Sequence, residues 1–272
     1  MSMNFADLHI HSIYSDGVLS PKQIIDFAIK NGIRCISITD HDTVAALRFI
    51  QKSYEDLIIV PGIELSCVYN EEQIHILGYF IDIKSKILLN KIDKIQEGRK
   101  ERVKEIIKRL NQNNIFLDKF NMDKPGALGR GNIARELFKK GYATSPKQAF
   151  CKFLDIGKVA YVPNQKLNYK EAIDLIHMCQ GMAVLAHPGK IHRNMGLETM
   201  IKELKISGID GIEVYHSSHS NYQISNFYNL AKKYKLIITG GSDFHYIENG
   251  TISIGSKGIN EELYNKIIKY MF

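Results

Sequence analysis

The chain has few cysteines, and they lie far apart. Its 272 residues include four, with no CxxC pair among them: Cys35, Cys67, Cys151 and Cys179. Small secreted domains rely on dense disulfides, and structural zinc sites favour cysteine-rich ligand sets. The dispersed cysteines argue against both, so we expect reduced, mostly buried thiols in a cytoplasmic protein.

Long apolar runs are also absent, since no stretch approaches the roughly 20 apolar residues of a membrane-spanning helix. The first residues lack the basic and apolar segments of a secretory leader. The sequence contains no internal repeat and no low-complexity tract, and nothing in it indicates an obligate protein partner. We therefore expect no association with a membrane.

The composition is that of an ordinary globular protein, with 44% apolar and 24% charged residues. The length suits one medium-sized domain, or one domain with a sizeable insertion. A formal net charge of +7 favours anionic partners, such as phosphorylated or nucleic-acid substrates. A chain rich in Ile, Lys and Asn reaches this charge through base composition alone, so the charge is weak evidence.

Strand-like and helix-like segments alternate in the first and last thirds of the chain, which predicts an α/β fold with a mainly parallel sheet, open or closed into a barrel. Between them, residues 84–113 have a long helical pattern and residues 114–165 have short helices and loops, without any histidine. We interpret 84–165 as a mostly helical insertion between a first part, 1–83, and a second part, 166–272. Strands are expected at 5–11, 33–39, 57–66, 73–80, 182–186, 209–214 and 236–239, and helices at 20–32, 43–54, 169–179, 197–206, 222–234 and 261–270.

Histidines and carboxylates gather where these strands end. His9 and His11 end the first strand and Asp40 and His41 follow the second, and further strands end at Glu64, His187, Glu213 and Asp243. In an α/β barrel the residues at the carboxyl ends of the strands meet at one face. Imidazole and carboxylate groups hold borderline and hard divalent metals. The pattern therefore predicts a multinuclear metal site, although each motif alone also fits a turn or a helix cap.

Two positions add local detail. His9 and His11 lie two residues apart on a strand, so their side chains share one face and can hold the same ion. His75 lies within an apolar strand, where a single histidine is more often part of the core, but the other motifs favour a ligand. We expect Asp42 to cap the helix that follows it.

The ordered motifs resemble those of the polymerase and histidinol phosphatase (PHP) superfamily. Resemblance to this superfamily implies a distorted (β/α)7 barrel of the PHP type with a trinuclear metal centre. The motifs are Asp7-Leu8-His9-Ile10-His11, Asp16-Gly17, Thr39-Asp40-His41-Asp42, Gly62-Ile63-Glu64, His75-Ile76-Leu77-Gly78, Ala186-His187-Pro188 and Gly241-Ser242-Asp243-Phe244-His245.

Carried over by position, the resemblance implies ligands for three divalent metal ions, with Mn, Fe or Zn fitting the mixed donors. Glu64 would bridge the first and second ions. The first would be held by His9, His11, Glu64 and Asp243, the second by Glu64, His75 and His187, and the third by Asp16, His41 and His245.

Residues 149–162 and 212–220 resemble one branch of the superfamily, which includes 3′,5′-bisphosphonucleotide phosphatases and 5′-to-3′ exoribonucleases acting on short 5′-phosphorylated RNA. Its helical insertion lies over the metals. Many relatives have Pro and then His after the arginine at the position of Arg130. Here Gly131 and Asn132 follow, a difference that concerns substrate contacts rather than metal ligands.

The implied reaction is phosphoester hydrolysis by a metal-bound hydroxide. As candidate catalytic residues we take Asp40, His216 and His219; either histidine could protonate the leaving oxygen, bind phosphate, or be an exposed loop residue. Arg130, flanked by glycines, is the strongest candidate for binding a second phosphate, and surface charge is the alternative reading for every basic candidate. The substrate-binding candidates are Arg130, Asn132, Arg135, Lys152 and Arg193.

Three other functions fit parts of this pattern. One is a PHP phosphatase for another small phosphomonoester, such as histidinol phosphate, although the insertion argues mildly against it. A second is an amidohydrolase, which usually has a carboxylated lysine or a different His–Asp pattern. The third is a non-enzymatic, basic nucleic-acid-binding module with a structural metal. A Mn²⁺-dependent phosphatase assay separates these classes.

Overall fold

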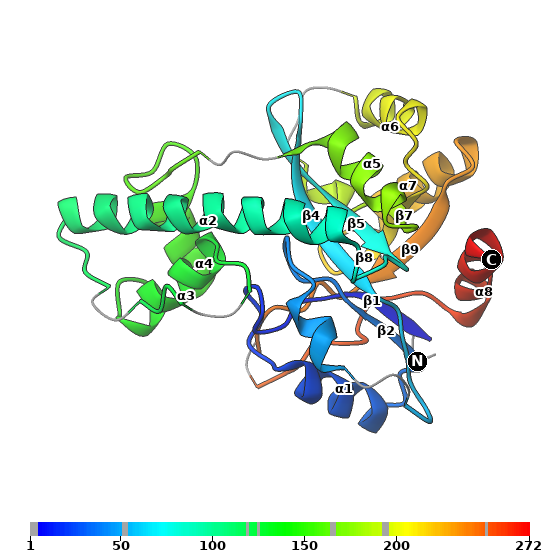
Figure 1. Cartoon of the computed structure of the whole chain (residues 1–272), viewed down its shortest axis with the longest axis horizontal. Coiled ribbons are helices and arrows are strands. Elements are labelled where there is room, and N and C mark those ends of the chain that lie inside the picture. Colours follow the sequence, from blue (N-terminus) through cyan, green and yellow to red (C-terminus); the bar gives the residue numbers. More distant parts are fainter. Residues whose placement is uncertain are drawn as a thin grey trace.

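The computed structural model describes residues 5–50, 54–117, 120–123, 126–163, 167–191, 196–247 and 250–272. It is an α/β fold with two sheets (Figure 1). The smaller sheet is parallel and has the order β1-β2-β3, and the larger has the order β6-β4-β5-β7-β8-β9. The strands are β1 Ala6–Ile10, β2 Cys35–Ile38, β3 Ile58–Ile59, β4 Gly62–Tyr69, β5 Glu72–Tyr79, β6 Leu167–Asn168, β7 Met182–Leu185, β8 Gly211–His216 and β9 Ile237–Gly241.

Most strand pairs are parallel, as expected, but the larger sheet is mixed because of one strand. β5 runs antiparallel to both β4 and β7, while β7, β8 and β9 are parallel. β4 and β5 form a hairpin whose turn residues, Asn70 and Glu71, have φ values of 45° and 68°. Two left-handed residues are typical of the tightest hairpin turns, but the glycine that usually marks such a turn is missing here, so the turn is hard to predict from the sequence.

The two sheets approach each other at two places, beyond the ends of β1 and β2. β1 lies beside the segment after β9, where the His11 N–H donates to the Phe244 carbonyl at 3.0 Å and the Asp243 N–H donates to the His9 carbonyl at 2.8 Å. A parallel bridge joins His41 to Glu64 at the start of β4. These contacts lie at the carboxyl ends of β1, β2 and β9. They place the histidines and carboxylates that follow these strands close to one another.

Most of the expected helices are present. The helix α1, Pro21–Lys30, begins with the expected capping box between Ser20 and Gln23. The helix expected over 43–54 is wrong, because a 3₁₀ turn at Ala45–Phe49 replaces it, and 51–53 fall outside the described residues. The Asp42 side chain does not cap a helix there: it accepts hydrogen bonds from Arg99 and from the Ser66 N–H. The remaining helices beside the sheets are α5 Tyr169–Met178, α6 Leu197–Ile206, α7 Asn221–Lys233 and α8 Glu261–Met271, with a 3₁₀ turn at Pro188–Lys190.

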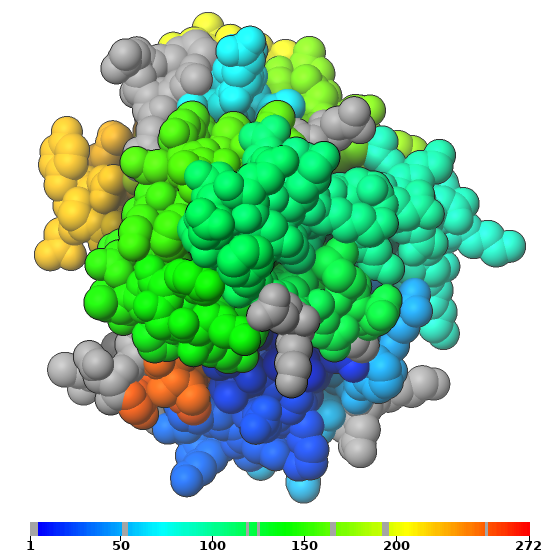
Figure 2. Space-filling view, turned by 90° about the vertical axis from the view of Figure 1, so that its left-hand side faces the viewer, coloured from blue at the N-terminus to red at the C-terminus, as the bar shows by residue number. Residues whose placement is uncertain are grey.

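The middle of the chain projects from the sheets. The helix α2, Lys86–Gln112, extends outward, and α3, Arg130–Lys139, and α4, Pro146–Ala149, pack beneath it with the π-helical turn Phe150–Leu154 (Figure 1). Viewed from this end, residues of this segment cover much of the face (Figure 2). None of the described helices combines the length and apolar character needed to cross a bilayer.

The projecting segment has a hydrophobic core of its own. Leu88 and Ile92 at the start of α2 belong to the main core between the sheets and helices. Val103, Ile106 and Leu110, further along α2, pack instead in a separate buried cluster with residues of α3 and the π-helical turn. One continuous helix therefore joins two cores.

Candidate active site

A buried hydrogen-bond network shapes the loop between β1 and α1. The Asp40 carboxylate accepts hydrogen bonds from the Ser12 N–H at 2.7 Å and from the hydroxyls of Ser12 and Ser15 at 2.5 Å. This tight turn brings Asp16 back toward His11. Asp40 therefore acts on the shape of the loop, and its oxygens are occupied by these donors.

Four donor atoms form a compact set at the end of β1, near the start of β4 and just after β9. His9 Nε2 lies 3.5 Å from Glu64 Oε2 and 3.3 Å from Asp243 Oδ1. His11 Nε2 lies 3.2 Å from each of the same two oxygens. Donors about 2.1 Å from a tetrahedral ion are about 3.4 Å apart, so these spacings suit one such ion. This is the set that the resemblance assigned to the first metal.

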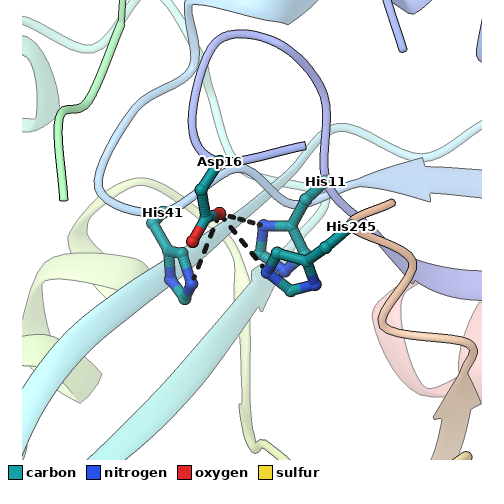
Figure 3. Close-up of side chains that lie close together, drawn as sticks. All are labelled: His11, Asp16, His41 and His245. Atoms are coloured by element: carbon teal, nitrogen blue, oxygen red, sulfur yellow. Dashed lines mark ion pairs between the residues drawn. The ribbon is translucent and has the colours of Figure 1, made fainter. Parts of the chain in front are cut away.

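A second group surrounds Asp16 (Figure 3). Asp16 Oδ1 lies 3.3 Å from His245 Nε2, 3.9 Å from His41 Nε2 and 4.0 Å from His11 Nδ1. The structure thus brings together the three residues assigned to the third metal. It adds His11, whose two ring nitrogens face different groups.

The other oxygen of Glu64 faces the remaining expected ligands. Glu64 Oε1 lies 2.7 Å from His75 Nδ1 and 3.0 Å from His187 Nε2. Glu64 Oε2 lies 2.9 Å from His41 Nδ1. A carboxylate with different imidazoles on its two oxygens has the arrangement expected of a bridging ligand.

The chemistry of these donors suits divalent metals. Among the described residues, buried ring nitrogens and carboxylate oxygens in this region have no hydrogen-bond partner, which is costly unless something else satisfies them. Except for His187, the residues that carry them belong to groups whose donor atoms lie within 4.8 Å of one another, close enough to share an ion. These atoms are His9 Nε2, His11 Nε2, Asp16 Oδ1, His41 Nδ1, Glu64 Oε2, His187 Nδ1 and His216 Nε2.

Two of the expected ligands already have the protonation state that a metal requires. Burial alone would raise the pKa of Glu64, but His41, His75 and His9 lower it well below its usual value. Burial lowers the pKa of His187 to about 3, assisted by the Lys190 cation. Metal ligands must be deprotonated carboxylates and neutral imidazoles, and these two groups meet that condition at neutral pH.

Three further residues lie near the donors. Glu213 and Lys190 were not among the predicted site residues, and His216 was predicted as a catalytic candidate. Glu213 Oε1 accepts a hydrogen bond from His9 Nδ1 at 3.0 Å, and Glu213 Oε2 accepts one from the His187 N–H at 2.7 Å. Lys190 Nζ lies 2.5 Å from Asp243 Oδ2. His216 Nε2 lies 3.2 Å from that same oxygen, so it faces the donor cluster. The place of Glu213 at a strand end was a usable clue, whereas no motif marks Lys190.

Both ring nitrogens of His219 form hydrogen bonds with backbone groups of the protein. Its Nδ1 pairs with the Val214 carbonyl at 2.9 Å, and its Nε2 accepts a hydrogen bond from the Gly189 N–H at 3.1 Å. This tautomer fixes the loop that follows His187 and leaves no ring nitrogen for a substrate. The contact is close, because a Cβ on Gly189 would lie 2.5 Å from the His219 ring.

The expected substrate-binding residues of α3 make mostly internal contacts. Arg130 donates to the Leu154 carbonyl at 3.1 Å and its guanidinium lies over the Phe150 ring, 4.6 Å from the centroid. Asn132 donates to the Ser15 carbonyl at 2.9 Å. Arg135 donates to the carbonyls of Asp16 and Gly17 at 2.5 and 3.1 Å, so it holds the loop that carries Asp16.

Two expected substrate-binding residues, Lys152 and Arg193, do not belong to α3. Lys152 belongs to the π-helical turn, is exposed, and lies over the Phe153 ring at 4.8 Å from its centroid. It is not among the residues that line the cleft described next. Arg193 falls outside the described residues.

A cleft of about 480 Å³ opens between the projecting segment and the donor cluster. One wall carries Asp16, Asp243 and His245, so the cleft reaches two of the donor groups. The opposite wall comes from α3, α4 and the π-helical turn. Its other lining residues include three basic side chains and two aromatic ones: Arg135, Lys147, Lys190, Phe150 and Tyr246.

Comparison with known proteins agrees with this geometry. A family model described as the PHP domain matches residues 7–270. The chain belongs to the PHP domain family. This PHP protein is 34% identical over 247 residues to the 5'-3' exoribonuclease Rnm of Escherichia coli (strain K12), which covers 88% of this chain and 84% of that one. It is 32% identical over 256 residues to a 3',5'-nucleoside bisphosphate phosphatase of Chromobacterium violaceum, with 92% and 90% covered.

A solved structure from Chromobacterium violaceum, described as an amidohydrolase with bound sulfate and no metal, has a TM-score of 0.85 to this PHP protein. The two are 28% identical, and the match covers 98% of this chain and 96% of that one. The family and its relatives make the chain an enzyme, a metal-dependent phosphoesterase, which confirms the resemblance and sets aside the non-enzymatic alternative.

Proposed function

We propose that this enzyme hydrolyses phosphate esters of nucleotides, as a 3′,5′-bisphosphonucleotide phosphatase or a 5′-to-3′ exoribonuclease for short 5′-phosphorylated RNA. The observation that carries the proposal is the cleft, which joins metal donors to basic and aromatic side chains. Arginine and lysine bind phosphate, and an aromatic ring provides a stacking surface for a base. The activities named for the two relatives support the same substrate class.

The proposal includes three metal ions, of Mn, Fe or Zn, held by the residues assigned above: His9, His11, Asp16, His41, Glu64, His75, His187, Asp243 and His245. It also includes a barrel made by the two sheets, residues 84–165 as a cap, and the divisions 1–83 and 166–272. The four free cysteines support a cytoplasmic location.

Divalent metals, when bound, supply an activated water and neutralise charge on the phosphoryl oxygens. The chain's own residues orient the substrate. Lys190 reaches the cleft beside Asp243 and is placed to pair with a phosphate oxygen. Phe150 carries the Arg130 cation on its ring, and it lines the cleft where a base would stack. The cap thereby selects for a nucleoside attached to the phosphate.

His216 is the better of the two histidines proposed for catalysis. Its Nε2 faces Asp243, and its Nδ1 contacts the Ser218 hydroxyl at 2.8 Å, so the ring is fixed toward the donor cluster. His219 uses both nitrogens for backbone groups. We assign His216 to the metals or the phosphate and His219 to the shape of the loop. Asp40 supports the loop that carries Asp16.

The test is a substrate panel with added Mn²⁺. It contains a 3′,5′-bisphosphonucleotide, a short 5′-phosphorylated RNA, histidinol phosphate and a generic phosphomonoester. We expect turnover of the first two to exceed the others, and Phe150→Ala to raise KM for them while leaving KM for the generic ester unchanged. Preferred turnover of histidinol phosphate, or no effect of Phe150→Ala on nucleotides, would contradict the proposed substrate class.

A further inference from the structure

Arg99 is a buried arginine in the middle of α2, with 8% of its surface exposed. Its Nε and Nη2 both donate to Asp42 Oδ2, the first at 2.8 Å, and Nη2 also donates to Ser66 Oγ at 3.0 Å. Its Nη1 donates to the Leu128 carbonyl at 3.0 Å. A planar guanidinium bound at several points fixes both the distance and the angle between the segments it joins.

Two of these partners sit directly beside metal donors. Asp42 follows His41, and its N–H donates to the Glu64 carbonyl at 2.9 Å. Ser66 lies two residues after Glu64 on β4, so the two side chains share a face of the strand. The Ser66 N–H donates to Asp42 Oδ1 at 2.9 Å, which closes the ring of contacts.

The third partner of Arg99, the Leu128 carbonyl, belongs to the cap. Leu128 lies just before α3, which begins at Arg130. In the first turn of α3, Gly131 packs so closely on Asp16 that an added Cβ would lie 2.4 Å from Asp16 Oδ2. The position of Leu128 therefore affects how near α3 comes to the donor group around Asp16.

We propose that Arg99 is a positioning residue for the metal centre. Through Asp42 and Ser66 it sets the spacing between His41 and Glu64, and through Leu128 it holds the cap in register with that spacing. The proposal rests on the ligand roles proposed for His41 and Glu64. Lysine keeps the charge but lacks the planar fork, so it cannot maintain all of these contacts together.

The test compares Arg99→Met and Arg99→Lys with a matched control, Arg102→Met. Arg102 lies one turn along α2 and donates to the Val162 carbonyl at 2.8 Å, within the cap and away from the donors. The measurements are Mn²⁺ affinity by chelator competition, kcat and KM with a generic phosphomonoester, and the thermal midpoint of the metal-free protein.

We expect Mn²⁺ affinity and kcat to fall roughly tenfold or more in Arg99→Met, which is the usual cost of losing a group that orients metal ligands. Arg99→Lys should lie between Arg99→Met and wild type, and Arg102→Met should stay within about twofold of wild type on both measures. KM for the generic ester should change less than kcat, because Arg99 is not among the residues that line the cleft and acts on it only through the cap.

Removing one member of a buried ion pair also destabilises a protein, so stability must be separated from positioning. The double variant Asp42→Asn/Arg99→Met removes the uncompensated carboxylate. We expect it to regain thermal stability relative to Arg99→Met without regaining Mn²⁺ affinity. Recovery of both together would mean that the pair only holds the fold, and the proposal would be wrong.

His41→Ala separates this inference from the ligand assignment. If His41→Ala keeps full Mn²⁺ affinity, the proposed ligand role of His41 fails. If His41→Ala loses affinity while Arg99→Met and Arg99→Lys bind Mn²⁺ and turn over like wild type, the ligand role stands and the positioning role of Arg99 is refuted.

Discussion

Glu213→Gln isolates the effect of a carboxylate that supports two histidines proposed as metal ligands. Glu213 is fully buried, and burial alone would raise its pKa, but His9 and His216 lower that pKa to about 2. The ionised carboxylate accepts a hydrogen bond from His9 Nδ1 and another from the His187 N–H. With a metal bound, the first bond would keep the His9 proton on Nδ1 and leave Nε2 free to face the ion, as in many metalloenzymes.

The magnitude follows from counting acceptors. Glutamine has the same shape as glutamate, but it offers one acceptor oxygen and an NH₂ donor. One of the two N–H groups, on His9 or on the His187 backbone, must then face another donor in a buried site. A buried donor left without an acceptor costs about 1–3 kcal/mol. We therefore expect Mn²⁺ affinity and kcat/KM to fall about 10- to 100-fold.

Chelator competition measures the affinity, and hydrolysis of a generic phosphomonoester at saturating Mn²⁺ measures the rate. Glu203→Gln is the matched control, because Glu203 accepts a hydrogen bond from Tyr69 and lies away from the donors. The reasoning is refuted if Glu213→Gln keeps affinity and kcat/KM within about twofold of wild type. It is also refuted if the control shows the same loss.

Four further results are expected. Lys190→Met should raise KM for a bisphosphonucleotide about tenfold or more, because a charge-assisted hydrogen bond contributes about 1.5–3 kcal/mol. An unchanged KM would exclude Lys190 from phosphate binding. Asp243→Asn should lose both metal and activity, so full retention of either in metal analysis and the nucleotide assay would contradict its ligand role. Mn²⁺ at about 100 times its Kd should stabilise the chelator-treated protein in thermal unfolding by about 2.7 kcal/mol for each ion bound. No shift would mean that the folded state binds no metal preferentially. Burial would lower the pKa of His245, but Asp16 and Asp243 raise it to about 9. The stability that the charged His245 contributes is present below the ordinary pKa of 6.5 and is lost as the pH rises through 9. The thermal midpoint of the metal-free protein should therefore fall over that range. An equal fall in His245→Asn would show that His245 is not its cause.

Much of the fold was predictable where local chemistry and burial agree. The capping box at Ser20 and Gln23 marks α1, and apolar runs mark the strands. The prediction failed at 43–54, because Asp42 bonds to Arg99, a residue 57 positions away that no local pattern reveals. The direction of β5 was missed because a turn of Asn70 and Glu71 lacks the glycine that usually identifies a hairpin.

The donor cluster was predictable for a different reason. Residues at the ends of strands converge whatever the intervening loops do, so His9, His11 and Asp243 meet as expected. Side chains on loops and helices have no such constraint. Arg135 donates a hydrogen bond to the Asp16 carbonyl of the loop after β1, and Lys190 reaches the site from a 3₁₀ turn. Only the tertiary arrangement determines these partners.

The continuity of α2 has a mechanical consequence. Its base is embedded among the sheets and its far half carries the cap's own core, and its 27 residues span about 40 Å. Such a helix behaves as a rigid lever: a tilt of about 5° at the base moves the far end by about 3.5 Å. Arg99 lies near the midpoint of this lever, tied to the loops below. We therefore expect that repacking Leu88 or Ile92 at the base would shift the cap wall of the cleft relative to the donors.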